Sequence, residues 1–433
     1  MQPTAPKEIV QVMRDGKRYP SPVRALGSGS SVTRCVTANG GTVVDMSSMD
    51  RILSIEGDSV TVQPGVRLLD LAEKLRQKGL ELIGGIDLAD RSVGGAVCGS
   101  GLEATISGNV SQFAGHALKL KVISPEGKRF VVSDSTKNLL GMMRLSYGLL
   151  GIVYEVTLRV RPIRGFTTQT ASLNFKDFAK LNNRMHAAPA GIKLCLMPFR
   201  DRIFMELRRP AKDGKTGSNY KWKLRDWAMY SALPTVAKSL VRAVPYRPLS
   251  YPLIDNISER TQRLVTSPKP SAGSNAIEQS GRVRALQHDR FHYCTWAFPA
   301  DDMTNVVLAY KVFCKEHYGR TGFRCEMPTV CFRLRQDRSA LLSPSFDGPV
   351  LTLSPLTTQS AGWEDFMFDF AEFAAEHAGI PLFNQTRNAT FEQANRAYGK
   401  RLEMFAKMRS SIDPHDRLLN QFFATYLNGP ASV

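Results

Sequence analysis

The sequence has no long apolar run and no arrangement of cysteines that would bind a metal. No stretch of about 18 consecutive apolar residues occurs in the 433 residues, and the N-terminal residues lack the charged-then-apolar order of a secretory signal. The seven cysteines form no CxxC pair and no metal-ligand spacing. We therefore expect a cytoplasmic protein with free thiols and no structural metal.

Acidic residues are scarce relative to basic ones. The chain has 39 Asp and Glu against 57 Lys and Arg, which leaves a formal net charge of +18. A field of this size favours anionic partners, such as nucleic acid, anionic lipid or a phosphorylated substrate. The basic residues are dispersed, however, and helix-turn-helix, zinc-finger and RNP-like signatures are absent. We therefore expect no nucleic-acid partner.

The chain is longer than one hydrophobic core normally serves, so we expect two domains. Up to about residue 162 the pattern predicts short strands separated by glycine, with one helix over 68–79. Beyond residue 162 it predicts longer strands and helices, so the class is α+β. The expected strands are 40–46, 52–57, 59–65, 116–127, 128–134, 151–162, 199–210, 291–299, 327–334 and 350–356. The helices expected in the second part are 302–318, 362–378 and 390–409.

One basic and aromatic segment, residues 219–251, stands apart. It carries six Lys or Arg against one Asp, interleaved with Trp222 and Trp227. Two interpretations stay open. Either the segment makes peripheral contact with an anionic membrane, with its basic groups at the headgroups, or it is a helical excursion that packs on its own domain and is broken by its prolines.

Four motifs follow one another in a fixed order. They are VRALGSGSS (23–31), GGTVVDMSSMDRIL (40–53), DRSVGGAVCGSG (90–101) and GLLGIVYEVTLRVRP (148–162). The first predicts a turn whose free N–H groups can surround a pyrophosphate. The third predicts a glycine-rich backbone that a flat ring can approach closely. Each motif is weak evidence when taken alone.

Together, in this order, the motifs resemble the FAD-binding domain of the vanillyl-alcohol oxidase and p-cresol methylhydroxylase flavoprotein family (the PCMH type). The resemblance covers residues 8–162 and implies two packed αβ subdomains that hold FAD. It implies a pyrophosphate loop of Gly27, Ser28, Gly29, Ser30 and Ser31. It implies a segment beside the flavin ring and diphosphate that contains Ser92, Val93, Gly94, Gly95, Gly99, Ser100 and Gly101. It places Gly151, Ile152 and Val153 at the adenine end.

The second half is similar to the aldonolactone and alditol oxidase branch of that family. The similarity rests on MPTVCFRLRQDRSALLSPS (327–345) and IDPHDRLLNQFF (412–423). It implies an FAD-binding domain over 1–162, a substrate-binding cap over 163–389 that contains the 219–251 insertion, and a segment, 390–433, that returns to the FAD-binding domain.

The pyrophosphate loop departs from the family at one position. Relatives often have a histidine there that is covalently attached to the flavin, and this sequence has Ser30. A serine hydroxyl cannot form that bond, so we expect FAD to be held non-covalently. A tether through Cys98 is the alternative, although a small buried thiol is the preferred interpretation.

The cap departs from the branch at the residues that would act on the substrate. The Glu-x-Arg pair of relatives is here Cys331 and Arg333, and their His-Trp-x-Lys motif is replaced by 382–385, Leu-Phe-Asn-Gln. The surviving Arg333 is a candidate for stabilising negative charge. His292 and Tyr293 are candidates for proton transfer because the resemblance implies that such cap strands face the flavin. Strand alternation predicts that at most one of these two points inward.

The resemblance implies an FAD-dependent oxidoreductase, an oxidase or dehydrogenase, that moves a hydride from a CH–OH group to flavin N5. The basic charge and the aromatic segment favour a small or lipid-like, anionic substrate. Gly101 favours an oxidase, because the matching residue in the branch controls the access of oxygen. The alternatives are a non-redox transferase like the alkylglycerone-phosphate synthases, which keep FAD, and a non-catalytic flavin-bound partner protein.

Overall fold

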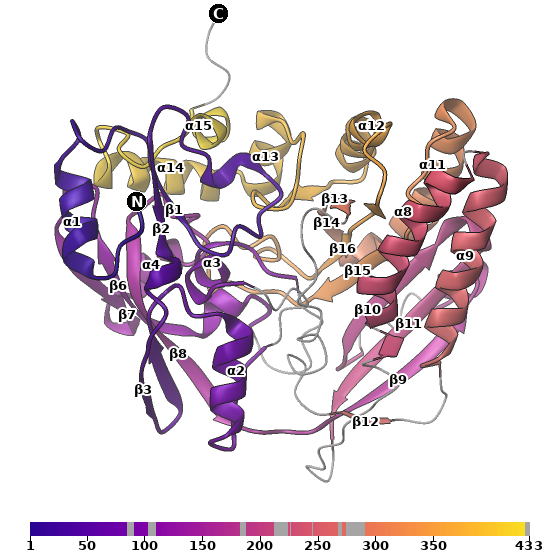
Figure 1. Cartoon of the computed structure of the whole chain (residues 1–433), viewed down its shortest axis with the longest axis horizontal. Coiled ribbons are helices and arrows are strands. Elements are labelled where there is room, and N and C mark those ends of the chain that lie inside the picture. Colours follow the sequence, from indigo (N-terminus) through magenta and orange to yellow (C-terminus); the bar gives the residue numbers. More distant parts are fainter. Residues whose placement is uncertain are drawn as a thin grey trace, which may run out of the picture.

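The computed structural model describes residues 1–84, 91–102, 110–181, 188–211, 224–225, 227–244, 246–266, 271–273 and 291–428. The chain forms two halves that lie side by side (Figure 1). The first 162 residues and the C-terminal helices share one half, and the strands from residue 166 onward form the other.

The N-terminal half is built on a six-stranded antiparallel sheet. Its order is β3-β4-β8-β6-β7, and β5 also pairs with β8. The strands are β3 (Ile52–Glu56), β4 (Ser59–Val62), β5 (Leu80–Leu82), β6 (Ala117–Ile123), β7 (Arg129–Ser133) and β8 (Ile152–Pro162). A parallel pair, β1 (Val23–Leu26) and β2 (Thr42–Asp45), lies apart from this sheet. The strands and the helix predicted in this half are confirmed.

Four α-helices accompany these strands in the part of this half that the structure describes. They are α1 (Pro6–Arg14), α2 (Leu68–Arg76), α3 (Val93–Cys98) and α4 (Lys137–Met143). In α2, Leu68, Leu71 and Leu75 recur at helical spacing and are buried. Gly79 follows the helix with a φ of +72°, a conformation that favours glycine.

Three C-terminal helices pack on the same core. They are α13 (Phe391–Tyr398), α14 (Lys400–Ile412) and α15 (Gln421–Leu427). Tyr398, Phe405 and Phe423 belong to one buried cluster with Leu71 and Val156 of the N-terminal half. The prediction of a single last helix over 390–409 is wrong, because Gly399, with a φ of 48°, separates α13 from α14 and α15 follows.

The second half contains an eight-stranded sheet in the order β12-β9-β11-β10-β15-β16-β14-β18. Its strands are β9 (Phe166–Leu173), β10 (Gly191–Met197), β11 (Arg202–Pro210), β12 (Ser271–Gly273), β14 (Trp296–Pro299), β15 (Thr329–Leu334), β16 (Val350–Leu353) and β18 (Ile380–Pro381). The strand predicted over 291–299 is interrupted, because β13 (His292–Tyr293) pairs separately with β17 (Leu356–Thr357). The strand predicted over 350–356 is divided in the same way into β16 and β17.

Helices cover both faces of this sheet. They are α5 (Phe175–Ala179), α8 (Leu233–Ala243), α9 (Arg247–Arg263), α11 (Met303–Thr321) and α12 (Trp363–Glu376). Leu194 of β10 lies in a buried cluster with residues of α5, α11 and α12. Its neighbour Cys195 lies in a different cluster, with residues of α8 and α9. Alternation along the strand therefore gives the sheet two separate cores.

The predicted 219–251 segment is helical where the structure describes it, apart from Val244 and Tyr246 between the two helices, and α8 and α9 pack on the sheet. Residues 219–223, Asp226 and Pro245 lie outside the described residues. We expected Pro234 and Pro248 to break the segment, and they do not. Pro248 lies in the first turn of α9, where a missing N–H costs nothing, and Pro234 lies in the first turn of α8, directly after a π-helical turn over Ala228–Ala232. Among the described residues, no helix combines the length and apolar character needed to cross a bilayer.

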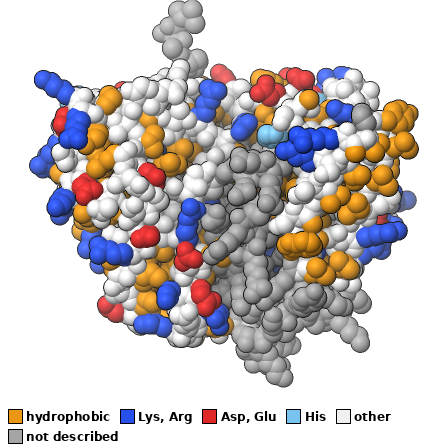
Figure 2. Space-filling view, in the orientation of Figure 1, with side chains coloured by type: hydrophobic (Ala, Val, Ile, Leu, Met, Phe, Trp, Pro, Cys, Tyr) orange, Lys and Arg blue, Asp and Glu red, His pale blue; other side chains and the backbone are white. Residues whose placement is uncertain are grey.

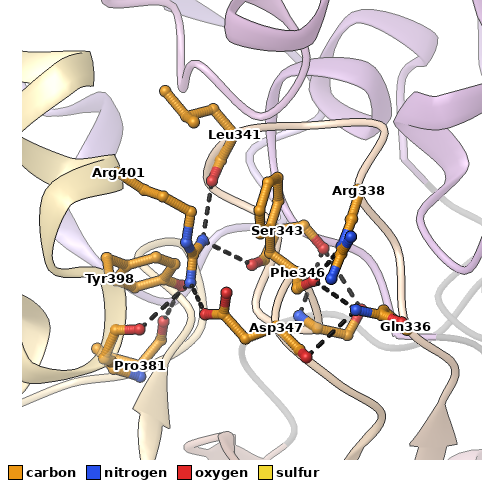
Figure 3. Close-up of polar contacts among 11 residues, drawn as sticks. Gln336, Arg338, Leu341, Ser343, Phe346, Asp347, Pro381, Tyr398 and Arg401 are labelled. Carbon is orange, nitrogen blue, oxygen red and sulfur yellow. Dashed lines mark hydrogen bonds and ion pairs between the residues drawn. The ribbon is translucent and has the colours of Figure 1, made fainter.

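The loop between β15 and β16 is tied to the C-terminal helices (Figure 3). Arg401 of α14 donates to the carbonyl oxygen of Leu341 at 2.9 Å and pairs with Asp347 at 2.7 Å. On its other side, Asp337 accepts hydrogen bonds from the backbone N–H groups of Ser111 and Gln112 at 2.7 and 2.6 Å. This loop therefore fixes how the two halves meet.

Candidate active site

A cleft of about 760 Å³ lies where the glycine-rich segments of the N-terminal half meet. Eleven of the predicted cofactor residues line it: Gly27, Ser28, Gly29, Ser30, Ser31, Ser92, Gly94, Gly95, Gly99, Gly151 and Val153. The other four do not. Val93 and Ile152 are buried in hydrophobic clusters, and Ser100 and Gly101 lie just beyond the lining. Segments that are far apart in the sequence thus form one concave surface.

Close backbone approach explains two of the glycines in this cleft. A Cβ at Gly27 would lie 2.2 Å from the hydroxyl oxygen of Ser92, and a Cβ at Gly94 would lie 2.7 Å from the Pro64 ring. The Ser28 hydroxyl accepts from the Ser92 N–H at 3.2 Å, which joins the two loops. Gly29 has a φ of +67° with open space beside it. The bare backbone that a diphosphate-binding loop needs is therefore present.

A buried arginine holds the wall of the cleft. Arg24 donates to the carbonyl oxygens of Cys35 and Leu418 at 2.8 and 2.7 Å, and also to that of Tyr147. Burial lowers the pKa of Arg24 to about 10, so it stays cationic at neutral pH. The Tyr147 hydroxyl lies 2.8 Å from the Ser100 hydroxyl. This network connects the first strand, the C-terminal segment and the glycine-rich segment.

Three side chains converge on the carbonyl oxygen of Ser100. Arg91, Asn384 and Gln385 each donate to it at 3.0 Å. The amide oxygens of Asn384 and Gln385, and the amide nitrogen of Gln112, are buried without a hydrogen-bond partner among the described residues. Buried polar atoms are seldom left unpaired. Because Asn384 lines the cleft, its unpaired amide oxygen fits a cofactor such as FAD, which is rich in hydroxyl and N–H groups.

The sequence motifs predict no role for these three residues. Arg91 lies within the third glycine-rich motif. Its guanidinium donates to the backbone carbonyl oxygens of Ser100 and Gly95, and such contacts cannot be predicted from the motif. Asn384 and Gln385 were noticed only as departures from the family motif. The sequence contains both the glycine-rich segment and the two adjacent amides, Asn384 and Gln385, but only the fold shows that these amides contact that segment.

A second, larger cleft of about 1570 Å³ opens beside the first. The two clefts share Gly29 and Ser31 of the pyrophosphate loop. The second cleft is lined by residues of both halves, among them Arg34, His292, Tyr293, Glu364, Phe368 and Arg387. It is therefore the space between the two halves that adjoins the candidate cofactor site.

His292 and Tyr293 both line this second cleft, whereas we expected at most one of them to point inward. The imidazole Nε2 of His292 lies 3.1 Å from the Ser360 hydroxyl. Burial, followed by the charge of Arg387, lowers the pKa of His292 below its ordinary value. Burial raises the pKa of Tyr293 to about 12. At neutral pH the pair therefore offers a neutral imidazole and a protonated phenol.

The Tyr293 hydroxyl is a buried donor without an acceptor. It has no hydrogen-bond partner among the described residues, and Arg91 is the largest charge acting on its pKa. An unpaired buried hydroxyl costs free energy unless a ligand uses it. Its position in the lining of the second cleft makes a ligand oxygen the natural partner.

Arg333 lies elsewhere. It is buried, and its guanidinium donates to the carbonyl oxygens of Ala188 and Ala190 at 2.7 and 2.8 Å. It lines neither of the two clefts. These bonds give Arg333 a structural task, and its catalytic role stays a prediction.

The face of β15 follows from alternation. Val330 and Phe332 belong to the buried cluster that contains Leu102 and Tyr293, while Cys331 belongs to the cluster beneath α11 and α12. The cysteine that replaces the family glutamate is therefore packed in the core on the other side of the sheet. All seven cysteines are free, as predicted.

Comparison with known proteins agrees with this architecture. Residues 1–133 match the family model described as FAD binding domain, and residues 156–426 match the one described as D-arabinono-1,4-lactone oxidase. The chain is 27% identical to an L-gulono-1,4-lactone dehydrogenase of Mycobacterium tuberculosis, over 98% of this chain and 94% of that protein. It is also 27% identical to a putative D-arabinono-1,4-lactone oxidase of Neurospora crassa, over 99% of this chain and 83% of that protein.

The fold is similar to that of a solved structure. Cholesterol oxidase from B. sterolicum superposes with a TM-score of 0.76 at 14% identity, covering 98% of this chain and 93% of that one. The predicted α+β class, with a PCMH-type FAD-binding unit and a cap, is confirmed, and so is the predicted resemblance to the aldonolactone oxidase branch.

Proposed function

The chain belongs to the D-arabinono-1,4-lactone oxidase family and is an FAD-dependent oxidoreductase acting on a CH–OH group, and we propose that it oxidises a small hydroxylated ring with FAD held non-covalently in the first cleft. One observation carries the proposal. Three separate segments that the sequence predicts for FAD line a single cleft, and that cleft adjoins a second one between the two halves.

FAD, when bound, supplies the hydride acceptor, and the protein supplies binding, orientation and proton transfer. We assign the backbone of Gly27 to Ser31 to the diphosphate, Ser92 to Gly95 and Gly99 to the ring and diphosphate, and Gly151 to Val153 to the adenine end. Ser100 and Gly101 are assigned to the ring end, where Arg91, Asn384 and Gln385 fix the Ser100 carbonyl.

Two side chains of the second cleft suit the proton transfer that accompanies oxidation of an alcohol. His292 is neutral at pH 7 because its pKa is lowered, so it can accept the proton of a substrate hydroxyl. Tyr293 stays protonated and can donate a hydrogen bond to a substrate oxygen. We leave Arg333 outside this machinery because its guanidinium bonds two backbone carbonyls.

The residues around the first cleft support non-covalent FAD. Ser30 stands where relatives have their attached histidine. Cys98 also lines the cleft, but burial raises the pKa of its thiol to about 11. A protonated thiol is a poor nucleophile, so a tether through Cys98 is disfavoured.

The substrate class follows from the relatives and from charge. Relatives that include the L-gulono-1,4-lactone dehydrogenase and a D-arabinono-1,4-lactone oxidase are named for aldonolactones, so we propose a hydroxylated ring of that size. The described lining of the second cleft contains Arg34 and Arg387 against the single acid Glu364, which favours an anionic substituent on that ring. The names of the relatives, all dehydrogenases or oxidases, do not favour the non-redox transferase alternative.

The test begins with the purified protein and added FAD. Acid precipitation is expected to release the flavin into the supernatant, whereas flavin that stays with the pellet would overturn the non-covalent proposal. Anaerobic mixing with aldono-1,4-lactones and with the matching aldonic acids is then expected to bleach the flavin. Cholesterol serves as the control, because the likeness to cholesterol oxidase concerns the fold alone. Turnover without bleaching would contradict an oxidation.

A further inference from the structure

The helix α9 buries polar residues beside the apolar Tyr251 and Ile254, and it exposes several other large apolar residues. Five polar residues of α9 are buried against the protein: Ser250, Asp255, Ser258, Thr261 and Gln262. Several of its large apolar side chains point outward instead, and Leu249 is 60% exposed. A helix that packs only on its own domain normally buries its apolar face.

Two residues of the inner face, Tyr251 and Asp255, have polar partners elsewhere in the cap. Asp255 pairs with Arg324 at 2.8 Å, and the Tyr251 hydroxyl lies 3.3 Å from the side-chain oxygen of Gln359. Gln359 also donates to Glu326 at 2.9 Å. Asp255 and Tyr251 are therefore used within the cap. Ser250 and Thr261 donate to carbonyl oxygens of their own helix, and the Ser258 hydroxyl is buried without a partner among the described residues.

The outer apolar residues form one stripe. Leu249, Leu253 and Ile257 follow at intervals of four, and Leu264 lies seven residues further on, so all four share one side of the helix. Tyr246, just before the helix, is 64% exposed and continues the stripe at that end. Figure 2 shows hydrophobic side chains gathered over the side of the molecule where Figure 1 places α8 and α9. We call these five residues the α9 stripe.

Exposed basic side chains lie on α8 and α9. Lys238, Arg242 and Arg260 are exposed, and none of them pairs with an acid among the described residues. The described part of the two helices contains only two acids. Asp255 is buried with Arg324, and Glu259 pairs with Arg200 and Arg263. This surface therefore offers apolar groups and positive charge together, without free negative charge.

The charge decides which occupant suits the surface. A second copy of this chain would bring like charges together, which costs free energy. The headgroups of an anionic bilayer would meet the basic groups, while leucine and tyrosine side chains enter the interface. The helix has 17 residues, about 25 Å at 1.5 Å per residue, and can lie in the plane of a membrane surface.

We propose that the α9 stripe, with Lys238, Arg242 and Arg260, docks the enzyme on an anionic membrane surface. The sequence suggested a membrane contact within residues 219–251, and the proposal places this contact mainly on α9. Within the 219–251 segment, Met229, Leu233 and Ala237 are buried in the cap, and the exposed apolar stripe lies mainly beyond it. The docking does not depend on the proposed reaction, so either can fail while the other holds.

Flotation with lipid vesicles tests the proposal on the FAD-loaded protein. The protein is expected to float with phosphatidylcholine vesicles that contain phosphatidylglycerol, and to stay behind with phosphatidylcholine alone. The variant L249S/L253S/I257S is expected to have a partition coefficient onto these vesicles that is lower by roughly tenfold or more, since each substitution removes an apolar side chain from the interface. The variant K238E/R242E/R260E is expected to lose binding as well.

Matched controls separate this surface from general effects. Three apolar residues on other elements, each of similar exposure, are replaced in L53S/V131S/M404S. Three exposed lysines elsewhere are reversed in K17E/K74E/K407E. Both controls are expected to float like the wild type, and bound FAD reports that each variant is folded. The proposal would be overturned if the stripe variant floated as well as the wild type, or if the wild type did not float at all. It would also be overturned if the wild type were a dimer and the stripe variant a monomer.

Discussion

The side-chain amide of Asn384 donates to the carbonyl oxygen of Ser100 at 3.0 Å, across 284 residues of sequence. The bond joins the segment after β18 to the glycine-rich segment of the N-terminal half. A Cβ at Gly99 would lie 3.2 Å from the same amide nitrogen, so the amide and the backbone are in close contact. The position of Ser100 and Gly101 is thus set from outside their own segment.

Replacing Asn384 with aspartate is expected to weaken FAD binding at least about tenfold, because a carboxylate cannot donate to the Ser100 carbonyl and would place two acceptors together. Titration of the apoprotein with FAD measures the effect. The matched control is Gln393→Glu, which removes a buried amide that donates to the Ala371 carbonyl away from the cleft. That control is expected to lower the free energy of unfolding without a specific loss of FAD. Unchanged FAD affinity in Asn384→Asp would contradict the role assigned to Asn384.

Replacing Gly27 with alanine is expected to push the Ser92 hydroxyl aside, because the new Cβ would lie 2.2 Å from it. That hydroxyl caps α3 by accepting from the Gly95 N–H at 3.3 Å. Loss of the cap should lower the free energy of unfolding by about 1 kcal/mol and raise the dissociation constant for FAD.

A second substitution shows whether this contact is the cause. In Gly27→Ala combined with Ser92→Gly, the clash is gone and glycine is a tolerable N-cap, so FAD affinity should recover in part. Gly16→Ala is the control, since a Cβ there has nothing within 4 Å. If the double variant lost more FAD affinity than the two single variants together, this explanation would be contradicted.

The sequence predicted the residues of the first cleft because each binding segment is local. A glycine-rich turn or a Ser-Val-Gly-Gly segment carries its backbone properties within a few residues, and the family order supplied the rest. The partners of Ser100 could not be predicted in this way. Asn384 and Gln385 contact it only because β18 and the following segment return to the first half, and this depends on tertiary structure.

The orientation of cap residues was equally beyond the sequence. Arg333 is two residues from Cys331 on β15, and only the pairing of β15 with β10 and β16 decides which face each side chain takes. The exposed stripe of α9 could not be predicted either, because its leucines resemble core residues until the buried face of the helix is known. Periodicity identifies a helix better than it identifies which side faces inward.

Replacing Tyr293 with phenylalanine is expected to lower kcat roughly tenfold or more while leaving the free energy of unfolding unchanged or slightly raised. The reason is that the Tyr293 hydroxyl is buried and unpaired among the described residues, so its removal costs no internal hydrogen bond. Steady-state kinetics and thermal unfolding measure the two effects.

Tyr398→Phe is the matched control. The Tyr398 hydroxyl is also buried but donates to the Pro381 carbonyl at 2.6 Å, so its loss should cost about 1 kcal/mol of stability without a comparable effect on kcat. An unchanged kcat in Tyr293→Phe would remove Tyr293 from the proposed machinery.

The pH dependence of kcat/KM should report His292. Because the pKa of His292 is lowered from its ordinary value of about 6.5, first by burial and then by the charge of Arg387, kcat/KM should rise with pH below 6.5 and be flat above. Protonation removes the acceptor, so activity is lost toward acid. His292→Asn should abolish this inflection and lower kcat.

Arg387→Gln tests the stated cause of the shift. Removing that positive charge makes protonation of His292 easier, so the inflection should move to higher pH, toward the ordinary value. Lys407→Gln, on an exposed part of α14, should leave the profile in place. An inflection that stays in place in Arg387→Gln, or persists in His292→Asn, would assign it to another group.

Replacing Gly101 with alanine is expected to slow the reaction of the reduced enzyme with oxygen roughly tenfold, which is about 1.4 kcal/mol in the barrier. The resemblance to the aldonolactone oxidase branch implies that a side chain at this position obstructs oxygen. The structure permits the substitution, because a Cβ would lie 3.7 Å from an Arg91 nitrogen, an ordinary contact, and the backbone is not left-handed.

Stopped-flow measurement separates the two half-reactions of Gly101→Ala. Anaerobic reduction by substrate should keep its rate, and so should turnover with an artificial acceptor, because neither requires oxygen to reach the flavin. Gly141→Ala is the control, since its Cβ would also meet only one atom, the Ser339 carbonyl oxygen at 3.7 Å, away from both clefts. If Gly101→Ala slows reduction and reoxidation equally, the substitution acts by displacing Arg91 and the Ser100 carbonyl, and the preference for oxygen must be set elsewhere in the cleft.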